Sequence, residues 1–254
     1  MGRLRVVLFS PEDRSIIKAP PSERRRFLDM ELCQVDPLYF SQLSGYNRAL
    51  LQRNKLLKST GFGTDLGAAL DVYDEQLLNY GKKLLARRKL FVRQLEEIAG
   101  VIHQKLTGDV ENMKLSYEPN VSEEKYEETL FHARDRDISF RSTTVGPHRD
   151  DFRYEANGID MRKFGSQGQQ RTAALSLKLS ELKLVEKLTG EKPVLLLDDV
   201  LSELDESRQT KLLESMGGIQ TLITCTGVGD FLKSRLKINR IYQINRGKVA
   251  AMQD

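Results

Sequence analysis

The stretch Val194-Leu195-Leu196-Leu197-Asp198-Asp199 is a near-continuous apolar run that ends in two adjacent carboxylates. Such a run is typical of a strand covered by helices on both faces, as in a parallel α/β sheet, and the carboxyl ends of parallel strands open into the ligand crevice. Magnesium is held by one or two carboxylates together with phosphate oxygens and water. The stretch therefore predicts a Walker B element, in which Asp198 holds the metal and Asp199, the catalytic residue, orients or deprotonates the attacking water. The alternative is a buried strand whose acids only cap the next turn.

The next motif is Ser202-Glu203-Leu204-Asp205, at the spacing of the D-loop that follows Walker B in ABC ATPases. In this interpretation Asp205 belongs to the nucleotide site. The alternative is a helix-capping segment, in which Ser202 or Asp205 accepts hydrogen bonds from free N–H groups.

A glycine-rich turn, Phe164-Gly165-Ser166-Gln167-Gly168-Gln169-Gln170-Arg171, lies upstream and precedes a long helical pattern. Glycine lets the backbone approach a phosphate closely, and a helix N-terminus offers free N–H groups and positive potential. This is the pattern of an ABC signature loop, which grips the nucleotide held by the opposite subunit. We therefore expect Ser166, Gln167, Gly168 and Gln169 to bind nucleotide. The alternative for the turn alone is a simple helix start.

Periodicity and turn residues predict the remaining elements. Strands are expected at 4–9, 112–118, 138–146, 150–164 (a hairpin turning at Asn157-Gly158), 193–199, 221–226 and 240–252 (a hairpin turning at 245–247). Helices are expected at 22–35 (capped by Ser22), 38–59, 65–106, 122–135, 166–190 (ending at Gly190) and 206–216.

In the long helix, apolar residues recur every seven positions, at Leu70, Leu77, Leu84, Phe91 and Ile98. This coiled-coil-like stripe predicts an antiparallel helical arm packed on its neighbour. A buried core is favoured over a partner-binding role.

The formal net charge is +4, which does not by itself indicate a nucleic-acid partner. Two basic clusters are candidate DNA contacts, with a solvated helix face as the alternative for each. The first is Arg24, Arg25 and Arg26; the second is Lys82, Lys83, Arg87, Arg88, Lys89 and Arg93. No aromatic platform accompanies them, so single-strand binding by base stacking is disfavoured.

Only two cysteines occur, Cys33 and Cys225, and they are expected to be reduced, buried thiols in a cytoplasmic protein. No CxxC zinc pattern is present, and no apolar run is long enough for a membrane span. His148 and Arg149, between a Gly-Pro pair and two aspartates, are candidates for sensing nucleotide, although a lone histidine near a turn is more often structural.

Taken together, the chain resembles the RecF family. The resemblance is carried by Pro11-Glu12-Asp13, Lys18, Arg24–Asp29, Thr143–Asp151, the glycine-rich turn, and Asp198 through Asp205 with Arg208 and Leu212. It implies an α/β fold: an ABC-type ATPase head (partial lobe I) with an inserted, mainly α-helical arm domain (lobe II). The head comprises 1–20 and 137–254, and the arm 21–136.

The resemblance also implies a function. Members of the family are ATP- and Mg²⁺-dependent dimerising ATPases of recombinational DNA repair and the SOS response. They bind duplex DNA at gap junctions and work with RecR and RecO to load RecA. A Rad50-like protein is disfavoured because the arm lacks a CxxC hook. A nuclease of the overcoming-lysogenisation-defect type is disfavoured because no acidic nuclease domain follows the head.

Two features depart from the family pattern. The sequence contains no G-x-x-x-x-G-K-[ST] loop, and it opens within a strand, which suggests a truncated chain that binds and hydrolyses ATP poorly alone. A non-catalytic module that binds RecR or DNA through the arm is the alternative function. No histidine follows the strand after the D-loop, so Thr224 or Thr226 is expected in place of a switch histidine, and hydrolysis should be slow.

Overall fold

The computed structural model describes residues 4–59, 66–226 and 238–252 of the 254-residue chain. The described elements are β1 (Val6–Phe9), η1 (Pro11–Asp13), α1 (Arg14–Lys18), α2 (Pro21–Val35), α3 (Pro37–Lys58), α4 (Leu66–Thr107), β2 (Met113–Glu118), α5 (Tyr126–His132), α6 (Arg134–Phe140), η2 (Pro147–Arg149), β3 (Asp151–Ala156), β4 (Ile159–Asp160), α7 (Gln167–Thr189), β5 (Val194–Asp198), η3 (Leu201–Glu203), α8 (Glu206–Ser215), β6 (Thr221–Thr224), β7 (Ile241–Asn245) and β8 (Lys248–Met252).

The chain separates into two compact units. The first contains the residues up to Val7 and Glu12–Pro193, and the second contains Leu8–Pro11 and the chain from Val194 onward. These units are defined by packing alone. The division into a head (1–20 and 137–254) and an arm (21–136) stays a prediction.

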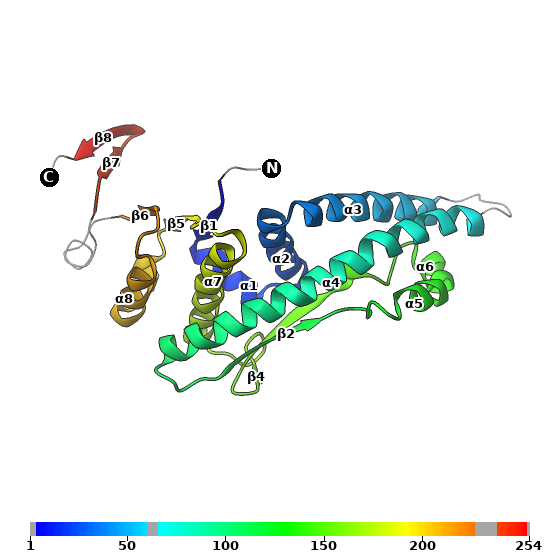
Figure 1. The fold of residues 1–254 in the computed structure, drawn as a ribbon, viewed down its shortest axis with the longest axis horizontal. Coiled ribbons are helices and arrows are strands. Elements are labelled where there is room, and N and C mark those ends of the chain that lie inside the picture. The colour runs from blue at the N-terminus through cyan, green and yellow to red at the C-terminus, as the bar shows by residue number, and fades with distance from the viewer. Residues whose placement is uncertain (1–3, 60–65, 227–237, 253–254) are drawn as a thin grey trace. The chain divides into compact units, whose positions relative to one another are not determined.

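Helix α4 is the long central helix of the first unit, and α3, α7 and β2 pack against it (Figure 1). Its heptad residues Leu70, Leu77, Leu84 and Phe91 are almost fully buried, which confirms that the stripe forms core. Helices α3 and α4 lie side by side, and β2 runs along α4. Gly81 permits α5 to pack closely on α4, because a Cβ at this position would lie 2.5 Å from the ring of Tyr126.

Two helix starts differ from the prediction. Helix α2 begins at Pro21, and its N-cap is Pro20, not Ser22, because the fixed φ of proline suits the first helical position. Helix α3 begins at Pro37, and Asp36 caps it by accepting from the backbone N–H groups of Leu38 and Tyr39. The pair Pro20-Pro21 marks the start of α2, and the pair Asp36-Pro37 marks the start of α3.

The segment after α5 also differs. The single helix expected at 122–135 is two short helices, α5 and α6, and the strand expected at 138–146 does not form. Helix α6 ends where Arg141 takes a left-handed φ of 52°. The following loop is fixed by the buried carboxylate of Asp137, which accepts hydrogen bonds from both the N–H and the hydroxyl of Thr144. This polar anchoring outweighs the strand propensity of the threonines.

Strands β2, β3 and β4 form an antiparallel sheet in that order. The β3–β4 hairpin turns at Asn157 and Gly158, both with positive φ, as the sequence predicts. Helix α7 ends at Gly190 in the left-handed conformation, which confirms the predicted C-terminus.

In the second unit, β5 and β6 pair in parallel. The hairpin β7–β8 turns at Arg246 and Gly247, which have positive φ. The apolar sequence of 221–226 predicts a buried strand, but β6 is partly exposed, and Leu222 is 53% exposed. Both cysteines are free, as expected, but neither is buried: Cys33 is half-buried and Cys225 is exposed.

Candidate functional site

The signature turn, Ser166–Gln169, begins α7. The Ser166 hydroxyl accepts from the Gln169 backbone N–H at 3.2 Å, and the Gln169 side-chain oxygen accepts from the Ser166 N–H at 2.9 Å. This reciprocal pair is a capping box, which fixes the first turn of a helix. Ser166, Gln167 and Gly168 are exposed, so the helix presents its positive end at the surface.

Gly165, directly before the signature turn, and Gly168, within it, differ in what surrounds them. A Cβ at Gly165 would lie 2.7 Å from the backbone oxygen of Met161, so the fold itself requires a glycine there. A Cβ at Gly168 would meet nothing within 4 Å. Glycine weakens a helix relative to alanine, and no contact with the described residues explains why position 168 is a glycine. An open backbone at a helix N-terminus is suited to close approach of an anion.

The Walker B acids lie at the carboxyl end of β5, beside the end of β6. Asp198 pairs with Thr224 in the parallel register, and the Thr224 hydroxyl donates to Oδ1 of Asp198 at 2.5 Å. The Asp199 N–H donates to both the hydroxyl and the carbonyl of Thr224 at 3.2 Å. The structure thus brings together three residues that the sequence nominates separately.

Asp199 has a left-handed φ of 52°, a conformation that aspartate tolerates better than most residues. Its carbonyl and Oδ1 accept from the Ser202 hydroxyl at 2.7 and 3.1 Å. Both acids are exposed. The Asp199 carboxylate is thus held by Ser202, whereas the Asp198 carboxylate is held by Thr224.

Asp205 begins α8. Its side chain accepts from the Arg208 backbone N–H at 3.0 Å, and this hydrogen bond lowers the pKa of the Asp205 carboxyl. The same carboxylate pairs with the Arg208 guanidinium at 2.5 Å. Asp205 is therefore a helix N-cap, as the alternative interpretation of the D-loop segment expected.

His148 is held inside the first unit. Its Nε2 lies 2.9 Å from the carbonyl of Thr143, and its Nδ1 lies 2.7 Å from the hydroxyl of Tyr46. Burial lowers its pKa to about 4, so the ring is neutral, with Nε2 donating and Nδ1 accepting. The adjacent Arg149 is exposed and donates to the same carbonyl at 3.2 Å. Full use of both ring nitrogens favours a structural role for His148.

Two arginines proposed as DNA contacts are buried instead. Arg88 is 2% exposed and forms ion pairs with Asp29 at 2.7 Å and with Asp150 at 2.9 Å. Arg24 is also 2% exposed and is bound by both carboxylate oxygens of Asp151. Neither guanidinium can reach a phosphate from inside the core. The prediction that Arg24 and Arg88 contact DNA is therefore wrong. Unpaired buried charges are costly, which explains why each has a carboxylate partner.

The other basic residues lie nearer the surface. Arg25 is half-buried, and its guanidinium donates to the carbonyl of Asp150. On α4, Lys82 is half-buried, and Lys83, Arg87, Lys89 and Arg93 are exposed. Arg87 pairs with Asp36 at 3.2 Å.

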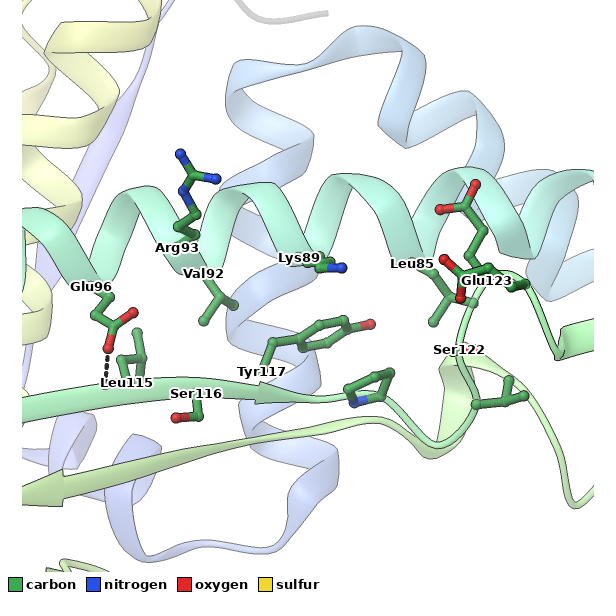
Figure 2. A pocket seen from close by; sticks show the side chains of 13 residues that line it. Leu85, Lys89, Val92, Arg93, Glu96, Leu115, Ser116, Tyr117, Ser122 and Glu123 are labelled. Atoms are coloured by element: carbon green, nitrogen blue, oxygen red, sulfur yellow. Dashed lines mark hydrogen bonds between the residues drawn. The ribbon is translucent and has the colours of Figure 1, made fainter. Parts of the chain in front are cut away.

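A groove of about 410 Å³ lies between α4 and β2 (Figure 2). Lys89 and Arg93 line it, and Arg93 points away from β2. At one end, Glu96 accepts from the Leu115 N–H on β2 at 3.2 Å. This contact satisfies a backbone donor on the outer edge of the sheet, where β2 lacks a strand neighbour.

Sequence reasoning missed Glu111, in the loop between α4 and β2. Its carboxylate accepts from the side-chain amide of Gln169 at 2.9 Å and contacts Nε2 of His103 at 2.9 Å. It missed Arg53 as well, a fully buried residue paired with Asp74 and Asp137. No local pattern identifies either residue, because Gln169 is distant in sequence from Glu111, and Asp74 and Asp137 are distant from Arg53.

Within residues 4–59, 66–226 and 238–252, no cluster of three or more His, Cys, Asp or Glu side chains has the arrangement of a metal site. None of the described helices combines the length and hydropathy that crossing a bilayer requires.

No family model matches the chain, but individual relatives do. It is 51% identical to the DNA replication and repair protein RecF of Agathobacter rectalis, over all of this chain and 70% of that protein. It is 52% identical to RecF of Lachnoclostridium phytofermentans, over 98% of this chain and 69% of that protein. RecF of Clostridium botulinum is 45% identical, over 98% of this chain and 70% of its own length.

Among solved structures, the recombination mediator protein RecF in its complex with ATP superposes with a TM-score of 0.88 at 39% identity, over 99% of this chain and 68% of that chain. This likeness confirms the predicted fold class, the α/β ABC-type head of RecF with its helical arm. The chain belongs to the RecF family of DNA replication and repair proteins.

Proposed function

We propose that this chain carries part of a composite ATP site in a dimerising DNA-repair ATPase. The arrangement of Asp198 and Asp199 at the end of β5 with Thr224 at the end of β6 carries the proposal. Asp198 would hold Mg²⁺, and Asp199 would orient the attacking water on a nucleotide bound in the same head. Thr224 occupies the place of the switch histidine. The solved relative named as a complex with ATP supports nucleotide binding.

The donor set fits magnesium. Asp198 is an exposed carboxylate at a strand end, which suits an ion that takes one or two carboxylates and fills its remaining positions with water and phosphate oxygens. When bound, magnesium would neutralise charge on the phosphates. The chain's own contribution is to fix Asp198 through the Thr224 hydroxyl and to aim Asp199 separately through its left-handed turn.

The signature turn would act on the nucleotide of a second copy. Ser166, Gln167, Gly168 and Gln169 would contact that nucleotide, so ATP binding would close the dimer and hydrolysis would open it. The exposed helix start and the open backbone at Gly168 support this role. Asp205 would lie at the same dimer interface as part of the D-loop.

The biological role follows from the family. One solved relative is described as a recombination mediator in the RecFOR pathway, which supports a role in DNA repair with RecR and RecO and in loading RecA at gaps, in the cytoplasm. Duplex DNA would contact the α4 cations, which are the half-buried Lys82 and the exposed Lys83, Arg87, Lys89 and Arg93.

ATP turnover by an extended chain tests the proposal. The extended chain is this sequence joined to the part of a RecF relative that it does not span. We expect slow turnover that Asp199→Asn abolishes, with ATP binding retained in the variant. Turnover that is indifferent to Asp199→Asn would contradict the assignment of the site. Binding of RecR or DNA without any turnover would favour the non-catalytic interaction module instead.

A further inference from the structure

Glu111 joins the signature turn to the arm helix, although it belongs to none of the motifs. One carboxylate oxygen accepts from Nε2 of Gln169 at 2.9 Å, and the other lies 2.9 Å from Nε2 of His103. Gln169 is in the first turn of α7, and His103 is in the last turns of α4. The Glu111 side chain is 15% exposed and that of His103 is 1% exposed, so the link is largely shielded from water.

The direction of every hydrogen bond in this link is determined. The Gln169 side-chain oxygen accepts from the Ser166 N–H, so its NH₂ group must face Glu111. Burial lowers the pKa of His103, so the ring is neutral near pH 7. Its single proton then lies on Nε2, facing the carboxylate.

The far side of the ring is satisfied too. Nδ1 of His103 lies 3.0 Å from the Tyr154 hydroxyl, which donates to it. Ser176 Oγ lies 2.9 Å from the same nitrogen, but its own proton goes to the carbonyl of Thr172 at 2.7 Å. Nδ1 therefore accepts, which leaves the ring proton on Nε2 facing Glu111, and the Gln169 amide has one orientation.

The backbone that carries Glu111 is anchored as well. Its N–H donates to the Thr107 hydroxyl at 3.4 Å, a long hydrogen bond at the end of α4. The next residue, Asn112, accepts from the side chain of Gln104 on α4 at 2.9 Å and donates its N–H to Asn157 at 2.8 Å. The carboxylate is therefore presented from a loop fixed to both α4 and the β3–β4 turn.

We propose that Glu111 is a positioning residue for the signature turn. By holding the Gln169 amide, it completes the capping box and keeps the Ser166 hydroxyl and the first free N–H groups of α7 in the arrangement that a phosphate of the second copy meets. Because His103 lies on α4, the same link makes the geometry of this turn depend on the arm helix. The inference rests on the nucleotide role proposed above for the signature turn.

Hydrogen exchange on this chain tests the positioning step without any nucleotide. Glu111→Ala should speed exchange of the Gln169 and Gln170 amides, which donate to Ser166 at 3.2 and 2.9 Å, by about fivefold to tenfold, as expected for loss of a charge-assisted hydrogen bond. Glu111→Gln should change the exchange rates of these amides less than about threefold. The oxygen of the new glutamine side chain can still accept from Gln169, and a shift of the His103 tautomer lets its amide group donate to that ring. Glu97→Ala, at an exposed position on α4 one to two turns before His103, is the matched control and should leave the exchange of both amides unchanged.

ATP-dependent dimerisation of the extended chain tests the consequence. Glu111→Ala should weaken dimerisation about tenfold while leaving the ATP affinity of the monomer close to that of the unmodified chain. Glu111→Gln should restore most of the loss. Unchanged exchange at Gln169 in Glu111→Ala, or faster exchange with unchanged dimerisation, would overturn the inference. If Ser166→Arg also left dimerisation intact, the proposed role of the signature turn would fail first, and the exchange result would show separately whether the link exists.

Discussion

The hydroxyl of Thr224 donates to Oδ1 of Asp198 at 2.5 Å and accepts from the backbone N–H of Asp199 at 3.2 Å. One side chain at the end of β6 thus holds the carboxylate of Asp198 and the backbone of Asp199 at the end of β5. A histidine at this position could contact a phosphate directly, whereas the threonine hydroxyl is committed to the acids. Slow hydrolysis is the expected consequence.

Thr224→Val tests that relationship, because valine keeps the shape of threonine and removes the hydroxyl. In the extended chain we expect turnover to fall at least about tenfold, the equivalent of one charge-assisted hydrogen bond. Thr224→Ser keeps the hydroxyl and should remain within about threefold of the unmodified chain. Steady-state ATP hydrolysis measures both. Equal turnover in the valine and serine variants would show that the hydroxyl has no part in the site.

Gly168→Ala should separate stability from function. Because a Cβ at Gly168 meets nothing within 4 Å, alanine should stabilise this chain by about 0.5–1 kcal/mol in urea unfolding. The same methyl group would obstruct close approach of a phosphate, so ATP-dependent dimerisation of the extended chain should weaken at least about tenfold. Gly100→Ala on α4, where a Cβ is equally unobstructed, should stabilise without affecting dimerisation. A dimer of unchanged affinity in Gly168→Ala would argue against the signature role.

Arg88→Met should destabilise the chain by about 3–5 kcal/mol, because it leaves the carboxylates of Asp29 and Asp150 without their buried partner. The neighbouring Lys89 is exposed, and Lys89→Met should alter stability by less than about 0.5 kcal/mol. Urea unfolding followed by circular dichroism gives both values. Similar small effects for the two variants would mean that the Arg88 network contributes little to folding.

Duplex DNA binding should depend on the exposed members of the α4 cluster. Replacing Lys83 and Lys89 together by glutamine should weaken binding and make the slope of log affinity against log salt shallower by about 2, one for each lost phosphate contact. Lys187→Gln and Lys192→Gln, at exposed positions elsewhere in the first unit, remove the same charge and should leave the slope unchanged. An equal loss in both pairs would indicate general attraction rather than a contact surface on α4.

Much of the fold could be predicted because its signals are local. The heptad stripe places α4, Asn157-Gly158 places the β3–β4 turn, and Gly190 ends α7. The segment 138–146 could not be predicted in this way. Its β-branched residues favour a strand, but the buried pair of Arg53 and Asp137 fixes a loop there, and these two residues are far apart in sequence.

For the candidate site, the spacing of residues along α4 predicts the burial of Arg88, which the local concentration of basic residues does not. Arg88 lies four residues after Leu84 and three before Phe91, so it falls on the buried face of α4 even though it sits in a basic run. Thr224 could be predicted to lie near the two acids because it belongs to the strand that follows the D-loop segment in sequence. Glu111 had no such signal, since its role depends on a contact with Gln169, 58 residues away.

Stability should fall as the solution is acidified, in part because of His148. Burial lowers the pKa of His148 from 6.5 to about 4 in the folded chain, so between those values the unfolded chain binds a proton that the folded chain does not. Unfolding then becomes more favourable as the pH falls from about 6.5 toward 4, by about 2 kcal/mol between pH 7 and 5. The lowered pKa of His103 acts in the same direction.

His148→Gln isolates that contribution. Glutamine can still donate to the Thr143 carbonyl and accept from the Tyr46 hydroxyl, but it does not titrate, so the slope of unfolding free energy against pH should flatten between pH 7 and 5. His132→Gln, at an exposed position on α5, should follow the unmodified chain. Urea unfolding at a series of pH values measures all three. A slope in His148→Gln as steep as that of the unmodified chain would show that other groups account for the loss, because the buried imidazole would then have no proton deficit to contribute.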